Sequence, residues 1–522
     1  MTSPAPPKSP DLSVKSKKYD RQIRLWGEHG QRLLECGTIC LVNACGLGCE
    51  VLKGLVLPGI GGFTVVDGST VTEEDVGTNF FLDPSCIGKN KAASCMILLQ
   101  ELNSDAQGDY VDESIDYILN NRPAFFESFR MVIASNLNEQ TLLRLSDSLW
   151  EANIPFIYCR SLGFFGSIRL QIKEHCIVEA HPDNRQLDLR LEFPYPTLEK
   201  HLNNTELSSK IPWLIVLSKF LHVWRSENEQ RIPKSYKEKS EIREMIRKAM
   251  NNQENYEEAI KAVNAAFGGG CVTTSLKAIF DDDACLNLNK ESDKFWIMVS
   301  ALKQFVYDNN DGLLPLQGVL PDMTADTESY INLQNVYRQQ ALDDANVIYC
   351  KCQANLRQLG LPEETITDAE VRLFCREAPG LTVVRGSKIS DEYKQNTRVL
   401  SILNDPEIHG SLTEIYLAFR AYEKFLTDYC SVPGECFAEH DTLKVKVIAN
   451  KILSELGVHM VLSDDIIHEI CRCGGSEMHT VSSFIGGCAA QEVIKIITKQ
   501  YVPVDNMFLY NAVTSETTTL KL

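Results

Sequence analysis

The residues with the clearest chemical meaning form a turn, Asn43-Ala-Cys-Gly-Leu-Gly48, followed about 20 residues later by an acid, Asp67. This order is typical of a nucleotide-binding turn, in which N–H groups at the start of a helix hold phosphate and the acid holds ribose. The first two glycines of the usual G-x-G-x-x-G pattern permit the tight turn and the close approach of phosphate. Asn43 and Cys45 occupy those positions, and only Gly48 matches the third. The sequence therefore predicts the scaffold of a nucleotide site that has lost its function.

The elements that position this turn have the pattern of strand, turn, helix and strand. Residues 38–42 are an apolar run, 50–57 carry a helical repeat that ends at Pro58-Gly59, and 63–66 form a second apolar run. The alternation continues to about residue 175, which predicts a doubly wound, mostly parallel α/β sheet. We expect further helices at 18–35, 89–102 and 140–152, and further strands at 131–134, 155–158 and 166–173.

A long stretch in the middle of the chain has a different pattern. Residues 176–445 are mostly helical in periodicity, and the clearest helix spans 326–358. We expect a hinge at Gly268-Gly269-Gly270 between two subdomains. The tail then returns to α/β character, with a helix at 481–499 and short strands at 507–510 and 517–520. We therefore expect one α/β domain, 17–175 with 446–522, split by a helical insertion, 176–445. Residues 1–16 are rich in Pro, Ser and Lys and are expected to be disordered.

Composition excludes several classes of protein. The net charge of −18 argues against binding to nucleic acid, which requires neutralisation of phosphates. The 18 cysteines form no C-x2-C pair, so a structural zinc site is not expected, and most thiols are expected to be core residues. The absence of a signal peptide and of a long apolar run predicts a reducing cytoplasmic or nuclear location and no membrane span.

Six motifs together resemble the ThiF/MoeB-like adenylation fold of the ubiquitin-activating enzyme family. They are Lys18-Tyr-Asp-Arg-Gln-Ile-Arg-Leu-Trp-Gly27, Gly46-Leu-Gly-Cys-Glu50, Ile87-Gly-Lys-Asn-Lys91, His181-Pro-Asp-Asn184, Leu320-Pro-Asp-Met323 with Leu333-Gln334, and the run from His479 to Lys495 with Gln491-Glu492. The family adenylates the C-terminus of a ubiquitin-like modifier with Mg-ATP and passes the acyl group to a cysteine. In heterodimeric members, one subunit holds the ATP site and the cysteine, and the other is a pseudo-adenylation half.

The length and the helical insertion resemble the regulatory subunits of neddylation-activating enzymes, because the corresponding sumoylation subunits are much shorter. At the site, Asn138 stands where the family has a magnesium-binding Asp, and Ser69 where a second Asp is usual. Asp75, Thr78 and Asn79 replace the family's Asn, Arg and Gln, whereas Asp67 and Lys91 match it. The resemblance thus implies that this chain binds neither nucleotide nor metal, and that Mg-ATP is bound by the partner subunit.

Two sets of residues are expected to act toward a partner. Arg21 matches a family arginine that reaches into the other protomer's ATP site, where its always-charged guanidinium neutralises triphosphate. The second set is implied to contact the catalytic subunit: Lys210, Ile211, Asp322, Met323, Tyr330, Leu333, Gln334 and Asn335.

The leading hypothesis is a regulatory, non-catalytic subunit that forms an obligate heterodimer with the catalytic subunit of a neddylation-activating enzyme. One alternative is a subunit of a sumoylation- or ubiquitin-activating enzyme, and another is a self-sufficient ThiF/MoeB-like adenylyltransferase. Without the resemblance, a nicotinamide-dependent oxidoreductase would also be considered, although the damaged turn argues against it. A pure adaptor, in which Arg21 is idle, also remains. The residues alone do not identify the modifier.

Overall fold

The computed structural model describes residues 17–183, 186–250, 253–394, 397–403, 411–435, 438–458 and 462–522. The expected disordered tail, 1–16, lies outside these ranges. Within them, no helix is long and apolar enough to cross a bilayer.

Contacts divide the chain into two units, which we describe separately. The α/β unit comprises Met1–His175 and Val384–Leu522, and the helical unit comprises Cys176–Val383. The predicted return to the α/β domain at 446 was therefore 62 residues too late, since residues 384–445 belong with the α/β unit. The reason is packing: Phe419 and Phe425 are buried in one core with Leu509 of the sheet.

The α/β unit is built on an eight-stranded sheet of order β10-β9-β6-β5-β4-β1-β2-β3. Strands β3, β2, β1, β4 and β5 are parallel, and β6, β9 and β10 are antiparallel, which confirms the predicted fold class. The bounds are β1 (Thr38–Val42), β2 (Gly62–Val66), β3 (Gln107–Val111), β4 (Met131–Ser135), β5 (Phe156–Leu162), β6 (Phe165–Gln171), β9 (Met507–Asn511) and β10 (Glu516–Leu520).

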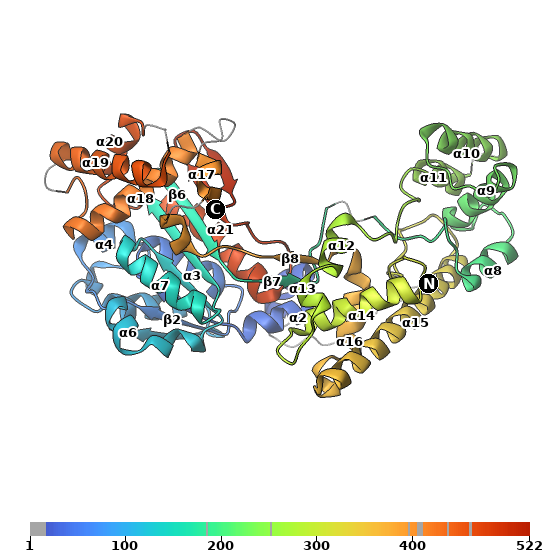
Figure 1. The fold of residues 1–522 in the computed structure, drawn as a ribbon, viewed down its shortest axis with the longest axis horizontal. Helices are drawn as coiled ribbons and strands as arrows, with labels where there is room; N and C mark the ends of the chain where they lie inside the picture. Colours follow the sequence, from blue (N-terminus) through green and yellow to red (C-terminus); the bar gives the residue numbers. More distant parts are fainter. Residues whose placement is uncertain are drawn as a thin grey trace, which may run out of the picture. The chain divides into compact units, whose positions relative to one another are not determined.

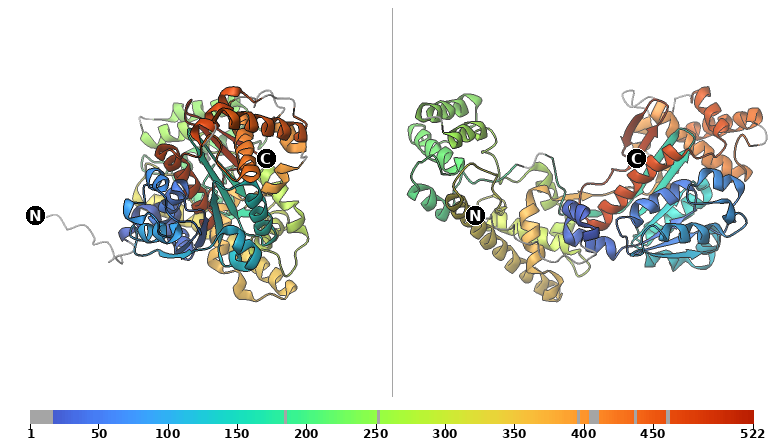
Figure 2. Two further views of the ribbon diagram at one scale, coloured as in Figure 1. Left: turned by 90° about the vertical axis from the view of Figure 1, so that its left-hand side faces the viewer. Right: turned by 180° about the vertical axis from the view of Figure 1, so that it is seen from behind.

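Helices cover both faces of this sheet (Figures 1 and 2). Along β1, Ile39 and Leu41 face one core, and Cys40 and Val42 face the other, so the strand is apolar from Ile39 to Val42. The helices of this unit are α2 (Asp20–Glu35), α3 (Gly46–Val56), α4 (Glu73–Thr78), α5 (Lys91–Gln100), α6 (Ile115–Asn121), α7 (Glu139–Glu151), α17 (Thr397–Leu403), α18 (Ser411–Tyr429), α19 (Ala438–Leu456), α20 (Asp464–Cys473) and α21 (His479–Thr498).

Helix α3 packs closely on α21. A Cβ atom at Gly54 would lie only 2.6 Å from that of Ala490, so the two backbones approach to a distance that a side chain would prevent. The predicted helix at 18–35 is present as α2, but it is interrupted at Gly27, whose φ of 71° lies outside the helical region. The two parts of α2 therefore follow different directions.

The helical unit contains two apolar cores. One contains Leu333 and Tyr337, the other contains Ala345 and Ile348, and the 33-residue helix α15 (Thr327–Leu359) contributes to both. The other helices are α8 (Pro196–Asn204), α9 (Trp213–Glu227), α10 (Tyr236–Ala249), α11 (Glu254–Ala262), α12 (Thr274–Phe280), α13 (Asp283–Leu286), α14 (Lys294–Asp308) and α16 (Asp368–Glu377). The short strands β7 (His175–Ile177) and β8 (Thr382–Val384) pair where the chain passes between the units.

Two of the three glycines at 268–270, Gly269 and Gly270, have a packing role. A Cβ at Gly269 would lie 2.7 Å from the carbonyl oxygen of Leu187, and one at Gly270 would lie 2.3 Å from Asp188 Oδ2. Side chains are therefore excluded here by close contact, and hinge motion at this point stays a prediction.

Candidate functional site

The turn between β1 and α3 begins with Asn43 in the left-handed region, at φ 70°. Glycine adopts this conformation without strain, and asparagine is one of the few other residues that tolerate it. The Asn43 side chain also stabilises the turn, because its Nδ2 donates to the carbonyl oxygens of Ser135 at 2.8 Å and Asn136 at 3.3 Å. Asn43 therefore keeps the shape of the turn and ties it to the end of β4.

Asp67 directly follows β2 and faces the same turn. Its Oδ2 accepts a hydrogen bond from the Ala44 N–H at 3.0 Å. Its Oδ1 accepts from the Ser69 N–H at 2.9 Å and from the Ser69 hydroxyl at 2.6 Å. The acid that would hold ribose thus accepts hydrogen bonds from its own chain, and Ser69 completes that arrangement.

The start of α3 is contacted by a residue that the sequence analysis did not identify, Glu477. Its Oε2 accepts from the Leu47 N–H at 2.8 Å, and its Oε1 accepts from Asn136 Nδ2. The side chain is buried, with 9% of the residue exposed. A Cβ atom at Gly46 would lie 2.6 Å from Oε2, so the carboxylate lies directly against the first turn of the helix. Burial raises the pKa of Glu477, and hydrogen bonds from Cys45 and the Leu47 N–H, together with the Lys91 charge, oppose that rise.

Lys91, the first residue of α5, pairs with Asp75 of α4. The distance from Nζ to Oδ1 is 2.7 Å, and the side chains are 13% and 19% exposed. Burial opposes ionisation of Asp75, but hydrogen bonds from Lys91 and Thr72 outweigh it, so the pKa of Asp75 is lowered. Burial likewise opposes the charge of Lys91, and Asp75 nevertheless raises the pKa of that lysine. The lysine that the family uses toward phosphate is therefore neutralised within the chain.

The other positions at which this chain departs from the family are occupied by Thr78, Asn79 and Asn138. Their side chains hydrogen-bond to nearby backbone groups. Asn79 is buried, and its Oδ1 accepts from the Phe81 N–H at 3.0 Å. The Thr78 hydroxyl donates to the Glu74 carbonyl at 3.1 Å. Asn138 caps α7, since its Oδ1 accepts from the Thr141 N–H at 2.9 Å. Among the described residues, no group of three or more His, Cys, Asp or Glu side chains is placed to hold a metal ion.

The cysteines of the turn have no features of a nucleophile. Cys45 Sγ lies 3.1 Å from Ser135 Oγ, and burial raises the pKa of its thiol well above the ordinary value. The thiol of Cys49 is fully buried, and its hydrogen bond with Cys95 and its burial raise its pKa in the same direction. Thiols in such surroundings stay protonated at neutral pH and are inert.

Arg21 has the opposite environment. It lies on the exposed side of α2, and within the described ranges no hydrogen bond or ion pair to its guanidinium is found. Arg24, one turn further along, pairs with Asp20 at 3.0 Å. Arg21 is therefore an exposed cation on the surface of α2.

The predicted contact residues all lie in the helical unit, and the structure separates them into two classes. The Asp326 N–H donates to the Lys210 carbonyl at 2.7 Å, which brings Lys210 next to the start of α15. Ile211 and Leu333 are 4% and 0% exposed and belong to the core, so their side chains are not on the surface. The other residues of the set are exposed or half-buried: Lys210, Asp322, Met323, Tyr330, Gln334 and Asn335.

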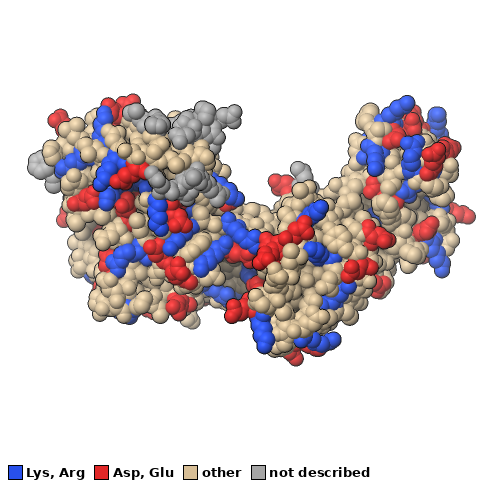
Figure 3. Space-filling model, in the orientation of Figure 1, with Lys and Arg blue, Asp and Glu red and all other residues tan. Residues whose placement is uncertain are grey.

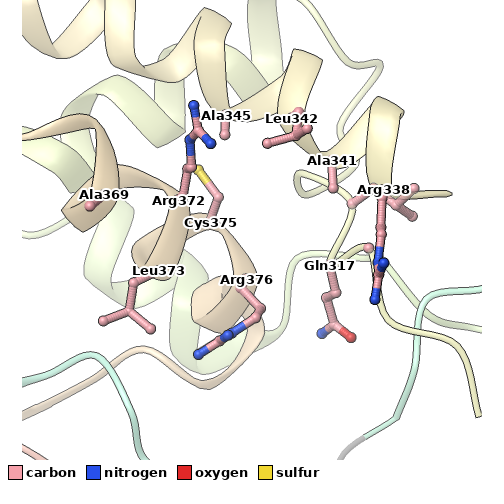
Figure 4. Close-up of a pocket in the computed structure, with 12 residues that line it drawn as sticks. Gln317, Arg338, Ala341, Leu342, Ala345, Ala369, Arg372, Leu373, Cys375 and Arg376 are labelled. Atoms are coloured by element: carbon pink, nitrogen blue, oxygen red, sulfur yellow. The ribbon is translucent and has the colours of Figure 1, made fainter. Parts of the chain in front are cut away.

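The helical unit also contains a hollow of about 450 Å³ between α15 and α16 (Figure 4). Apolar side chains and the arginines Arg338, Arg372 and Arg376 line it. Gln317 lies at its wall, 5% exposed, and neither atom of its side-chain amide has a hydrogen-bond partner among the described residues. None of the residues predicted from the nucleotide-binding pattern lies here.

The family model and the related sequences cover nearly the whole chain. The ThiF family model matches residues 19–522. The Nedd8-activating enzyme E1 regulatory subunit of Drosophila melanogaster is 64% identical, with 100% of both chains covered. Proteins of the same name from Xenopus laevis and Caenorhabditis elegans are 45% and 31% identical, with 98% and 97% of this chain and 99% of theirs covered. Among solved structures, Escherichia coli MccB with ATP is 17% identical and covers 30% of this chain and 50% of its own, at a TM-score of 0.27.

Proposed function

Because the chain belongs to the ThiF family and, within it, to the regulatory subunits of NEDD8-activating enzymes, we propose that it functions only in a heterodimer. The catalytic partner holds the working ATP site and the cysteine that accepts the modifier. This chain supports ATP-dependent adenylation of the C-terminal glycine of NEDD8 and transfer of the modifier to that cysteine. It binds no nucleotide or metal, and Mg-ATP is bound by the partner.

The observation that carries this proposal is the internal pairing of the two side chains that match the family's nucleotide ligands. Asp67 accepts three hydrogen bonds from its own chain, and Lys91 pairs with Asp75. Adenylyl transfer requires preorganised positive charge and a metal ligand at the phosphates. Neither the paired Lys91 nor the capping amide of Asn138 supplies these, so the residues present do not fit Mg-ATP.

Arg21 is the residue of this chain that we assign to the chemistry. Its exposure and lack of an ion-pair partner within the described residues support a role in trans, as a cation that enters the partner's ATP site. A planar guanidinium suits a triphosphate because it donates in a fixed fork and stays charged.

The surface gives further support. Six exposed or half-buried residues around the start of α15 are proposed to contact the catalytic subunit, and an obligate interface of this kind buries about 2,000 Å² or more. Charges of both signs are mixed on the face drawn in Figure 3, and the net charge is −18, so we propose no nucleic-acid partner. All seventeen cysteines that the structure describes are free thiols, which suits a cytoplasmic or nuclear location.

ATP–pyrophosphate exchange tests the proposal. The purified chain alone should show no exchange. Addition of the catalytic subunit should give exchange with NEDD8 and not with ubiquitin or a sumoylation modifier. Exchange by the isolated chain would show that it has a working ATP site and would contradict the proposal, and activity with another modifier would correct its substrate.

A further inference from the structure

Glu477 reaches the nucleotide-type turn from a distant part of the chain. It lies between α20 and α21, 430 residues from Leu47, whose N–H it accepts. Its backbone is held to the turn between β5 and β6, because the Gly163 N–H donates to the Ser476 carbonyl at 2.9 Å. The side chain is thereby directed at the first turn of α3, and its position does not depend on flexible surface contacts.

The groups around this carboxylate are donors. The N-terminus of a helix presents N–H groups without intrahelical partners and a positive end of the helix dipole, both of which favour an anion. Leu47 is the second residue of α3, and its N–H is one of these groups. Asn136 offers its amide nitrogen, since its Oδ1 already accepts from the Ser161 N–H at 3.1 Å. The Lys91 charge acts on the same carboxylate.

We propose that Glu477 is a built-in anion that occupies the phosphate-binding end of α3 and so excludes an external phosphate from this turn. The proposal rests on the proposed function, in which this chain has no nucleotide site, and adds the residue that keeps the site closed. Glu477 is a positioning residue: the carboxylate takes the place that a phosphate oxygen takes in a working turn. Removal of its side chain should leave an anion site of this chain's own, lined by the Leu47 N–H and the Asn136 amide.

A merely structural role would also make Glu477 important for stability, so the test must separate the two. A cap that acts only through shape or packing cannot be replaced by a free ion. A resident anion can be, because a small oxyanion supplies the missing acceptors to the same donors. Rescue of Glu477→Ala by acetate or inorganic phosphate is therefore the diagnostic property.

The experiment uses the full chain in complex with its catalytic partner. Thermal unfolding of wild type, Glu477→Ala and Glu469→Ala is followed in chloride, acetate and phosphate at matched ionic strength. Glu469 is the control, since it lies on the neighbouring helix α20 and pairs with Arg472. We expect Glu477→Ala to unfold at a lower temperature in chloride and to recover most of that loss in acetate or phosphate, with no such recovery for Glu469→Ala. Equal responses of all three proteins, or no response of Glu477→Ala, would overturn the proposal.

A second variant keeps the test decisive if Glu477→Ala does not fold. Glu477→Gln keeps the shape of the side chain but replaces the anion by a neutral amide. We expect faster hydrogen–deuterium exchange in peptides that cover residues 43–50, and unchanged exchange there in Glu469→Gln. Unchanged exchange in Glu477→Gln would contradict the proposal. ATP–pyrophosphate exchange by the isolated wild-type chain tests the proposed function separately, so either proposal can fail while the other stands.

Discussion

The turn after β1 and the exposed side of α2 belong to one unit, yet their charged side chains have opposite environments. In the turn, Asp67 and Glu477 accept hydrogen bonds from their own chain, and Lys91 pairs with Asp75. On α2, Arg21 is exposed and has no ion-pair partner in the part of the chain that the structure describes. This difference supports the proposal that the turn is structural and that Arg21 acts toward another molecule.

Energetics explain why the two regions diverge. Burial of a carboxylate such as Glu477 costs several kcal/mol unless donors compensate it, so its partners are fixed in the folded state. An exposed guanidinium is already solvated by water and needs no internal partner. A buried, hydrogen-bonded carboxylate contributes to stability, whereas an exposed guanidinium can bind a partner molecule.

The largest expected effect is on Arg21. Arg21→Ala should reduce ATP–pyrophosphate exchange by the complex about 10²-fold, because removal of one preorganised charge from a transition state typically has an effect of this size. The complex should still assemble, as measured by size-exclusion chromatography with light scattering.

Arg24→Ala is the matched control for this prediction. Arg24 is exposed on the same helix but pairs with Asp20, so its loss should leave exchange nearly unchanged. An equal loss of exchange in both variants would mean that any positive charge on α2 supports the reaction, and that Arg21 has no specific role. Full activity of Arg21→Ala would favour the adaptor in which this arginine is idle.

The second prediction tests whether the turn is structural. Asn43→Ala should lower the free energy of unfolding by about 2 kcal/mol, because alanine is strained at positive φ and loses the hydrogen bonds to β4. Asn43→Gly removes only the hydrogen bonds and should cost about 1 kcal/mol. Urea titration of the full chain measures both. A more stable glycine variant would show that the Asn43 side chain does not brace the turn.

The third prediction concerns the pH dependence of the Lys91–Asp75 pair. The pKa of Asp75 is lowered in the folded state, so the pair stabilises the chain above the ordinary value of 3.8, and this contribution is lost as pH falls through the lowered pKa. At pH 7, the free energy of unfolding of wild type should be about 1 kcal/mol higher than that of Asp75→Asn. The difference is small because the pair is partly solvated. The difference between the urea midpoints of the two proteins should be the same at pH 7 and pH 5 and should begin to narrow at pH 3. A difference between wild type and Asp75→Asn that stays constant with pH would show that ionisation of Asp75 is not linked to stability.

The sequence predicted the central strands well because they are apolar runs that are buried on both faces, as at residues 39–42. It did not predict β3 (Gln107–Val111), an edge strand whose residues are exposed or half-buried. It did not predict Glu477, because that contact spans 430 residues and an isolated acid before a helix has no characteristic spacing. The resemblance also placed Ile211 and Leu333 among the contact residues, although both lie in the core, because it assigns a stretch of chain rather than the faces of a helix. Local patterns specify elements, whereas contacts between distant segments decide which polar groups remain available.

The smallest effect is expected at Asn138, where the family's acid can be restored. Aspartate caps a helix as well as asparagine does and is favoured near a helix N-terminus, so Asn138→Asp should change stability by no more than about 0.5 kcal/mol. It should also gain no binding of Mg-ATP in isothermal titration calorimetry of the isolated chain. One restored ligand cannot recreate the site while Glu477 lies against α3 and Lys91 is paired with Asp75. Binding of Mg-ATP by this single variant would show that the turn is still open, and that Asn138 alone separates it from a working site.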